Sequence, residues 1–300
     1  MGHKKPTETT RSYLENAPLP NYSQSYTVVS HKDVIDTTHT LLTNHGFIIK
    51  KEIYRSNQDG KVVQGIYHLE STSIDPQIAN ESEMGMMFAW TNSYDKSARF
   101  QCAIGAYVFV CANGMINGDL MNFGRKHTGS AFSDIQLQIM NQITHAEQRY
   151  KKILADRDSL RNTPLVKRSQ AELLGRLFID KEILDITQLS AVKSEIDHPS
   201  FDYNSDPENA WTFYNHVTTA LKKSHPRTWL SDSRKFHEFI VADLLTPAGI
   251  KTYSENINSD FHVINTMPPE EEFLIDFGIK NINDIEEINE DDLKRYILAD

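Results

Sequence analysis

The stretch Ala98-Arg-Phe-Gln-Cys-Ala-Ile-Gly-Ala-Tyr-Val-Phe-Val-Cys111 holds the densest run of aromatic and β-branched side chains in the sequence. Its side chains alternate in two sets that are both largely apolar, which is the pattern of a strand covered on two faces. The sets are Phe100, Cys102, Ile104, Val108 and Val110 against Ala103, Gly105, Tyr107, Phe109 and Cys111. Asn113-Gly114 ends the run, because glycine reaches backbone angles that β-branched residues avoid. The sequence therefore predicts a central strand over residues 98–111.

A basic loop follows this predicted strand. Arg125, Lys126 and His127 stand between Gly124 and Gly129, so three basic or potentially basic side chains share one glycine-bounded segment. Loops that are held by a rigid strand often carry binding residues. We therefore expect the functional part of the protein at the ends of the strand, in this loop and at Arg99.

Two hairpins are expected to build the sheet. Residues 47–70 hold two β-rich runs on either side of Asp59-Gly60, a dipeptide that suits the left-handed positions of a tight turn. Residues 86–91 are expected to pair in the same way with residues 99–111, and residues 92–96 would form the loop between them.

Two helices are expected to flank the sheet. Ser30 and Asp33 have capping-box spacing, and apolar residues then recur at helical intervals, which predicts a helix over residues 30–45. A longer helix is expected over residues 133–161, with a length of roughly 40 Å at ~1.5 Å per residue. The surface of this long helix is basic, with Arg149, Lys151, Lys152, Arg157 and Arg161.

The second half of the chain is expected to be helical. Amphipathic patterns predict helices over residues 169–178, 207–222 and 231–245, the second of them with Asp206 as its N-cap and Pro207 as its first helical residue. The predicted fold class is α+β, an antiparallel sheet of two hairpins flanked by a short and a long helix, followed by a helical C-terminal half. The expected divisions are a flexible segment 1–25, an α+β core 26–165, a helical extension 166–250 and an acidic segment 251–300.

The formal charge of −10 is unevenly distributed. Residues 251–300 contain thirteen acids and four bases, a net charge of −9, so the rest of the chain is nearly neutral. Within that neutral part, residues 149–176 and 222–235 are locally basic. A neutral body with basic patches is compatible with a polyanionic partner, whereas an evenly spread negative charge would exclude one.

The sequence offers few parts for catalysis or metal binding. It lacks a phosphate-binding loop of the Gly-x-x-x-x-Gly-Lys type, a nucleophile elbow, paired cysteines and clustered histidines. Cys102 and Cys111 are expected to be buried thiols, too far apart along one strand to form a disulfide, and a thiol site at Cys111 with His127 is disfavoured because an apolar setting raises a thiol pKa. We expect a binding protein without a cofactor or metal, and not an enzyme. The N-terminus has no apolar signal region and no run is long enough to span a membrane, which favours a cytoplasmic protein.

Several short motifs follow one another along the chain. They are Thr91-Asn-Ser-Tyr-Asp95, Arg99-Phe100, Val108-Phe-Val-Cys-Ala-Asn-Gly114, Gly118-Asp119, Arg125-Lys-His-Thr-Gly129 and, further on, Asn209-Ala-Trp-Thr-Phe-Tyr-Asn-His-Val-Thr218. In these motifs the chain resembles a large phage- and plasmid-borne family known as a domain of unknown function, over about residues 26–245. The resemblance implies a mobile-element origin, in the cytoplasm of a host cell, and carries no known reaction.

The order of the predicted elements suggests a second similarity. A helix, two antiparallel hairpins and a long helix follow one another in the order found in the core of single-strand annealing recombination proteins, whose strands line a positively charged groove beneath a long helix. This similarity is one of fold alone, and fold does not establish function.

We therefore expect a phage or plasmid accessory protein that binds single-stranded nucleic acid, as an oligomer that promotes strand annealing. Phosphate binding needs cations along a groove, and single strands also use aromatic faces for stacking. The expected nucleic-acid-binding residues are Arg99, Arg125, Lys126, His127, Arg149, Lys152 and Tyr94. The alternative is a protein that binds or inhibits a host protein through its acidic segment, residues 251–300.

Overall fold

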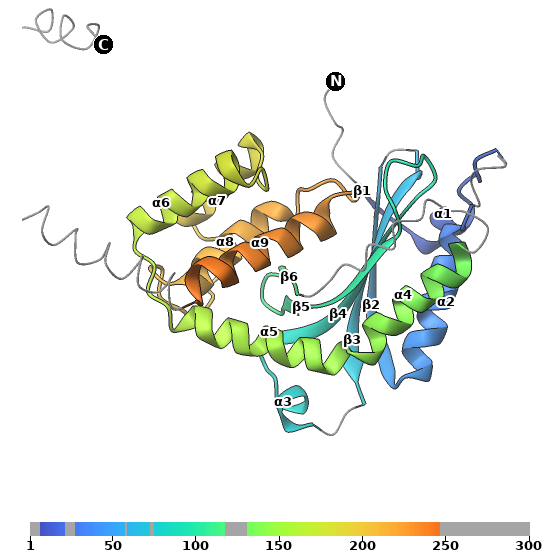
Figure 1. Ribbon diagram of the computed structural model, residues 1–300, viewed down its shortest axis with the longest axis horizontal. Helices are drawn as coiled ribbons and strands as arrows, with labels where there is room; N and C mark the ends of the chain where they lie inside the picture. The colour runs from blue at the N-terminus through green and yellow to red at the C-terminus, as the bar shows by residue number, and fades with distance from the viewer. Residues whose placement is uncertain (1–6, 22–27, 58, 73–74, 118–130, 247–300) are drawn as a thin grey trace, which may run out of the picture. The chain divides into compact units, whose positions relative to one another are not determined.

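The computed structural model describes residues 7–21, 28–57, 59–72, 75–117 and 131–246. Six strands form one antiparallel sheet in which each strand pairs with the next along the chain (Figure 1). The strands are β1 (Thr7–Thr9), β2 (Phe47–Ser56), β3 (Val62–Ser71), β4 (Met84–Ser93), β5 (Gln101–Val108) and β6 (Gly114–Ile116). The predicted α+β class is confirmed.

Both expected hairpins are present, and the sheet is wider than they predict. β1 adds to the edge of β2 and is followed by the short helix α1 (Arg11–Glu15), so the segment that the sequence suggested to be flexible carries two elements. β2 and β3 are joined through a turn that ends at Gly60, which has a φ of +67°. This left-handed angle is the one for which the Asp-Gly dipeptide was expected.

The predicted central strand is shorter than expected. β5 ends at Val108, because the Val108 N–H donates to Asn113 O and the Ala112 N–H donates to Val108 O, which turns the chain back towards β6. Phe109 and Val110 therefore leave the sheet and are half exposed, and Cys111 lies in the turn and not in the strand. Among the strands of eight or more residues, β4 is the one that is buried along its whole length.

The two faces of the sheet have different coverings. Met86, Phe88 and Trp90 of β4 face the large core under helices α2 (His31–Asn44), α4 (Ala131–Thr144) and α5 (Ala146–Arg161). The alternate residues Met87 and Ala89 face the opposite side. There they pack with Trp229 and Leu230 of helix α9 (Trp229–Leu244), which covers β4, β5 and β6.

Helix α2 lies within one residue of its predicted bounds at both ends. Its start is capped by the Ser30 hydroxyl, which accepts a hydrogen bond from the Asp33 N–H at 2.9 Å. The expected long helix is instead two helices, α4 (Ala131–Thr144) and α5 (Ala146–Arg161), with His145 between them at a non-helical φ and ψ of −104° and 13°. The break lets the two helices pack against different partners: α4 contacts α2, whereas α5 continues to the C-terminal half.

The C-terminal half is helical and packs on the sheet half, so that the described residues form one compact unit. Its helices are α6 (Lys167–Gly175) with the π-helical turn η1 (Arg176–Asp180), α7 (Ile186–Asp197), α8 (Ala210–Leu221) and α9; the single turn α3 (Pro76–Ala79) lies between β3 and β4. The N-cap of α8 is Asn209, whose side chain accepts the Thr212 N–H, and not Asp206 as expected. Asp206 instead accepts the Glu208 N–H in the preceding turn. None of the described helices is both long and apolar enough to cross a membrane.

Candidate nucleic-acid interface

Two of the predicted functional segments lie outside the described residues. Arg125, Lys126 and His127 fall within residues 118–130, and the acidic segment covers residues 251–300. Their expected roles stay predictions. The predicted residues that the structure describes are Tyr94, Arg99, Arg149 and Lys152.

Tyr94 is buried and cannot stack a base. Its hydroxyl accepts a hydrogen bond from the His31 N–H at 2.7 Å, and its ring lies on the His31 imidazole with the centroids 3.8 Å apart. His31 in turn contacts Gly60 O through Nε2 and the Asn92 amide through Nδ1. Burial lowers the pKa of His31 to about 4, so the imidazole is neutral at pH 7. This cluster joins the start of α2 to two turns of the sheet.

The basic side of α5 is neutralised by carboxylates. Lys152 forms an ion pair with Asp156 at 3.0 Å, and the Arg149 guanidinium donates to Gln142 Oε1. The other cations of the helix are paired with acids from the segment between β3 and β4: Lys151 with Asp75 at 2.5 Å, Arg157 with Glu81 at 2.8 Å and Arg161 with Glu83 at 3.0 Å. The predicted basic side of α5 is present, but four of its cations are already paired with carboxylates. The expected binding roles of Arg149 and Lys152 stay predictions.

Arg99 has the opposite environment. It stands exposed in the turn just before β5, and no carboxylate of the described residues contacts it. Of the four described residues that the sequence singled out, Arg99 is the one whose charge is exposed to solvent and unpaired. It precedes Gln101, which pairs with Thr91 near the end of β4, whereas the carboxylates that pair with α5 precede the start of β4.

A cavity of about 850 Å³ lies between the end of β2 and helices α7, α8 and α9. Arg55 of β2 reaches into its wall. One guanidinium nitrogen donates to Gln64 Oε1 at 3.1 Å, and the other donates to the backbone carbonyls of Lys222 and Ser224 at 2.6 and 3.1 Å. No carboxylate within the described ranges bonds this cation, and burial lowers its pKa from the ordinary arginine value.

Two lysines at the end of α8 complete the basic wall of the cavity. Lys222 donates to Cys111 O and lies 5.7 Å from the centre of the Phe201 ring, and burial lowers its pKa. Lys223 is exposed and has no partner in the part of the chain that the structure describes. Arg227, just beyond the cavity, is likewise exposed without a described carboxylate in contact.

The cavity also contains three carboxylates, which balance the charges of Arg55, Lys222 and Lys223. Asp185 is occupied as the N-cap of α7, where it accepts the Gln188 N–H at 2.7 Å. Burial raises the pKa of Asp232. Glu182 is exposed at the rim. The cavity therefore supplies a few unpaired donors and not a broad positive field.

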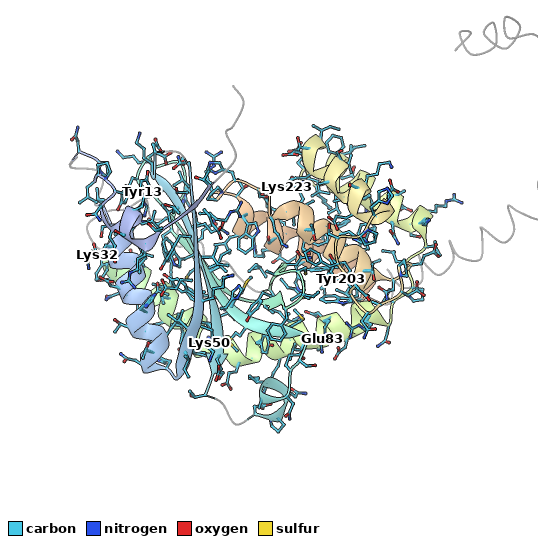
Figure 2. The ribbon with its side chains drawn as sticks, turned by 180° about the vertical axis from the view of Figure 1, so that it is seen from behind. Tyr13, Lys32, Lys50, Glu83, Tyr203 and Lys223 are labelled. Atoms are coloured by element: carbon cyan, nitrogen blue, oxygen red, sulfur yellow. The ribbon has the colours of Figure 1, made fainter. Side chains whose placement is uncertain are left out.

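A row of polar residues crosses the sheet at the end where the exposed cations lie. Arg55, Gln64, Thr91 and Gln101 are cross-strand neighbours in β2, β3, β4 and β5. Thr91 donates to Pro226 O at 3.1 Å, which fixes the segment after α8 to this end of the sheet. Four cations thus gather at one end of the sheet, here called the sheet-end cations: Arg55, Arg99, Lys223 and Arg227. Figure 2 shows Lys223 well away from Glu83, which marks the acidic partners of α5.

Aromatic side chains lie towards the other end of the same face. The Tyr107 ring passes over Gly85, where a Cβ would lie 2.5 Å from it, and stacks on His68 of β3 with the centroids 3.6 Å apart. Phe109 meets Tyr107 edge-on at 5.4 Å and is 49% exposed. Trp90 of β4 is fully buried on the opposite face.

Only part of this interface is signalled in the sequence. Lys222 and Lys223 belong to a run that was recognised as basic, and Phe109 and Tyr107 to the aromatic run. Arg55 is absent from the predicted set, because it is one of several charged residues in its strand, with Lys50, Lys51 and Glu52, and nothing in the sequence distinguishes it from them. Within the described ranges, no group of three or more histidine, cysteine, aspartate or glutamate residues could hold a metal ion.

Comparison with known proteins gives one match. The model of a family described as a domain of unknown function matches residues 18–243, which is most of the chain. No curated protein and no solved structure matches.

Proposed function

We propose that this chain, which belongs to the DUF932 family, binds single-stranded nucleic acid through phosphate contacts at the end of its sheet. The observation that carries the proposal is the state of the sheet-end cations. Arg99, Lys223 and Arg227 are exposed and lack carboxylate partners among the described residues. Arg55 lines the adjoining cavity with its charge bonded only to neutral acceptors in that part of the chain. An unpaired guanidinium or ammonium group is a ready partner for a phosphate.

The aromatic side chains at the other end of this sheet face favour binding of a single strand over binding of a duplex. Six residues separate Gln101 from Tyr107 along β5, a distance of about 20 Å at ~3.3 Å per residue. A strand held by the sheet-end cations would run along β2 and β3 to Phe109 and the Tyr107–His68 stack. Unpaired bases can stack on such rings, at about 1–3 kcal/mol per base, whereas the bases of a duplex are already stacked on one another.

The balanced charge of the cavity limits the strength of binding. Four sheet-end cations allow about four phosphate contacts, and each contact on a single strand changes the slope of log K against log salt by about −0.7. We therefore expect a slope of about −3 and a modest affinity, in contrast to proteins that enclose a strand in a basic groove.

The test is fluorescence anisotropy of a labelled single-stranded oligonucleotide with the full chain at low salt. We expect binding that a single-stranded competitor displaces and a duplex competitor of the same length displaces at least about tenfold less well. The variant Lys223→Ala/Arg227→Ala should bind about tenfold more weakly. Absence of binding at low salt, or equal competition by the duplex, contradicts the proposal.

Strand annealing by an oligomer is part of the same proposal and needs its own measurement. We expect light scattering after size exclusion to give a mass above the 34.4 kDa of one chain, and complementary oligonucleotides to pair faster when the protein is present. A monomer at micromolar concentration contradicts annealing by a ring and leaves strand binding to be judged by the anisotropy test. A phage or plasmid origin and a host-protein partner for the acidic segment both stay predictions.

A further inference from the structure

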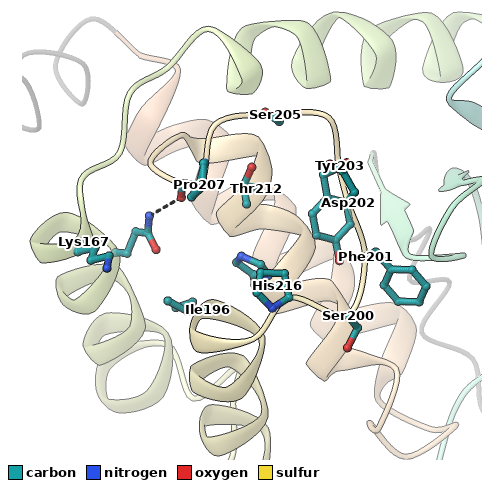
Figure 3. A pocket seen from close by; sticks show the side chains of 12 residues that line it. Lys167, Ile196, Ser200, Phe201, Asp202, Tyr203, Ser205, Pro207, Thr212 and His216 are labelled. Atoms are coloured by element: carbon teal, nitrogen blue, oxygen red, sulfur yellow. Dashed lines mark hydrogen bonds between the residues drawn. The ribbon is translucent and has the colours of Figure 1, made fainter.

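A second pocket lies apart from the sheet, in the helical half of the molecule. Its volume is about 510 Å³, and it opens between α6, α7, α8 and the loop of residues 199–207 (Figure 3). It shares no lining residue with the cavity that contains Arg55. Its own polar groups therefore need a separate explanation.

His216 of α8 points into this pocket (Figure 3). The residue is 3% exposed, and neither ring nitrogen has a hydrogen-bond partner among the described residues; Nδ1 is fully buried. Burial lowers the pKa of His216, so the ring is neutral at pH 7 and carries one N–H donor and one acceptor. Buried polar groups are nearly always hydrogen-bonded, and an unpartnered imidazole beside a pocket indicates a ligand that completes it.

Gln170 of α6 supplies a fixed acceptor in the same pocket. Its amide nitrogen donates to Leu165 O at 2.9 Å and to Pro207 O at 3.1 Å. These two bonds set the orientation of the amide and leave Oε1 as the group that remains to be bonded. No described residue donates to it. A ligand that presents an N–H to Gln170 and an acceptor to His216 would satisfy both side chains.

The walls of the pocket suit a planar ring. Ile196 and Pro199 line it together with two aromatic residues of the loop, Phe201 and Tyr203, whose rings are 6.4 Å apart. Tyr203 also meets the His216 ring edge-on at 5.8 Å. Apolar and aromatic walls with a few converging polar groups are typical of small-molecule sites.

Among the described residues, one cation lies at the mouth of the pocket. Lys167 is exposed at the start of α6, and none of the carboxylates described in the structure is paired with it. Asp202 lies on the rim, where its carboxylate accepts the Asn204 N–H at 2.8 Å. The pocket thus combines apolar and aromatic walls, two polar groups without partners among the described residues and one free positive charge at its entrance.

We propose that this pocket binds a nucleoside monophosphate. The base lies against the apolar and aromatic walls, and its edge, which carries a donor next to an acceptor, bonds Gln170 Oε1 and the His216 N–H. The phosphate binds Lys167. The proposal does not rest on strand binding at the sheet, because the two sites share no residue.

The test is calorimetric titration of the full chain with the four common ribonucleoside 5′-monophosphates. Ribose 5-phosphate and inorganic phosphate serve as separate ligands. We expect at least one monophosphate to bind with micromolar affinity and the two ligands without a base to bind at least about tenfold more weakly. Equal binding of ribose 5-phosphate, or no binding of any monophosphate at millimolar concentration, overturns the proposal.

Variants assign the parts of the site. Lys167→Met should weaken binding of the monophosphate at least about fivefold and leave binding of the matching nucleoside unchanged. Lys193→Met, an exposed lysine of α7 that is paired with Asp197, is the control and should change neither. His216→Phe should abolish binding of both while leaving oligonucleotide binding at the sheet intact.

A measurement on the unmodified chain keeps the proposal testable if His216→Phe fails to fold. In a ¹⁵N-histidine spectrum, the ring nitrogens of His216 should shift when the monophosphate is added, because a hydrogen bond forms where there was none. A bound monophosphate that leaves the His216 signals unmoved, or equal binding to the Lys167→Met variant and the wild type, overturns this site.

Discussion

Helix α5 and the segment of residues 222–227 are both basic in sequence, yet their cations are in opposite states. On α5, Lys151, Lys152, Arg157 and Arg161 are each paired with a carboxylate. In the segment after α8, the charges of Lys222, Lys223 and Arg227 have no carboxylate partner among the described residues. A basic run is therefore a candidate phosphate-binding surface only where no carboxylate of the folded chain already pairs with its cations.

The pairing on α5 has a structural role. Arg157 and Glu81 are nearly buried, and Glu81 also accepts the N–H groups of Glu83 and Met84 at the start of β4. The ion pair thus attaches the helix to the beginning of the buried central strand. Cations that hold a sheet in this way are not available to phosphate.

Breaking the Arg157–Glu81 ion pair should cost more stability than any other substitution considered below. Arg157→Met leaves the Glu81 carboxylate buried without its cation, and we expect a loss of about 3 kcal/mol in the free energy of unfolding. Urea denaturation measures it. Lys193→Met removes an exposed pair with Asp197 and should change stability by less than about 0.5 kcal/mol. If Arg157→Met is as stable as the wild type but binds oligonucleotide more weakly, α5 belongs to the interface and the comparison fails.

The buried cluster at Tyr94 gives the next effect, through pH. The pKa of His31 is about 4 in the folded protein and near its ordinary value of 6.5 in the unfolded chain. Between pH 4 and pH 6.5, His31 is therefore protonated in the unfolded chain and neutral in the folded protein. Stability from this group is full above pH 6.5, falls as the pH drops towards 4, and is about 2 kcal/mol lower at pH 5.

Urea denaturation at pH 7 and pH 5 tests the role of His31. The variant His31→Gln should have a lower stability at pH 7 and a smaller loss between the two pH values than the wild type. The same pH dependence in both proteins would show that the ring beneath Tyr94 is solvated, and Tyr94 would again be a candidate for base stacking.

The smallest effect concerns the exposed end of the aromatic run. Phe109→Ala should leave stability unchanged and weaken single-stranded oligonucleotide binding about fivefold, the loss of one base–ring stack. Val110→Ala is the matched control, since Val110 is equally exposed at 51% and offers no ring. Equal effects of the two substitutions on anisotropy would remove Phe109 from the interface.

Two local signals predict the structure correctly because their partners are close along the chain, whereas the N-cap of α8 is Asn209 and not the predicted Asp206. Ser30 and Asp33 define a helix start by themselves, and Asp59-Gly60 defines a turn. The sequence does not predict that the cations of α5 are paired or that Tyr94 is buried, because the residues that contact them are distant along the chain. Arg157 meets Glu81 across 76 positions, and Tyr94 meets His31 across 63. The sequence shows which residues are charged or aromatic. Only the fold determines whether a charge is already paired with another residue, or whether an aromatic ring is already buried.

The end of β5 is also not predicted by the sequence pattern, although the residues that set it are close along the chain. The alternation from Phe100 to Cys111 continues past the strand, because Phe109 and Val110 are as apolar as the residues before them. The turn is set by the hydrogen bond of Val108 to Asn113 and by Ala112 at a φ of +52°, neither of which the alternation encodes. The Asn113-Gly114 signal was correct, and the chain turns a few residues ahead of it.

We expect the unpaired cations to bind the nucleic-acid strand and the paired cations of α5 not to bind it. The salt dependence of oligonucleotide binding in two matched double variants distinguishes these two groups of cations. Lys223→Ala/Arg227→Ala should reduce the slope of log K against log salt by about 1.4, two phosphate contacts at ~0.7 each, while Lys151→Ala/Lys152→Ala leaves it unchanged. A reduced slope in the α5 variant, with a wild-type slope in the other, would contradict this expectation.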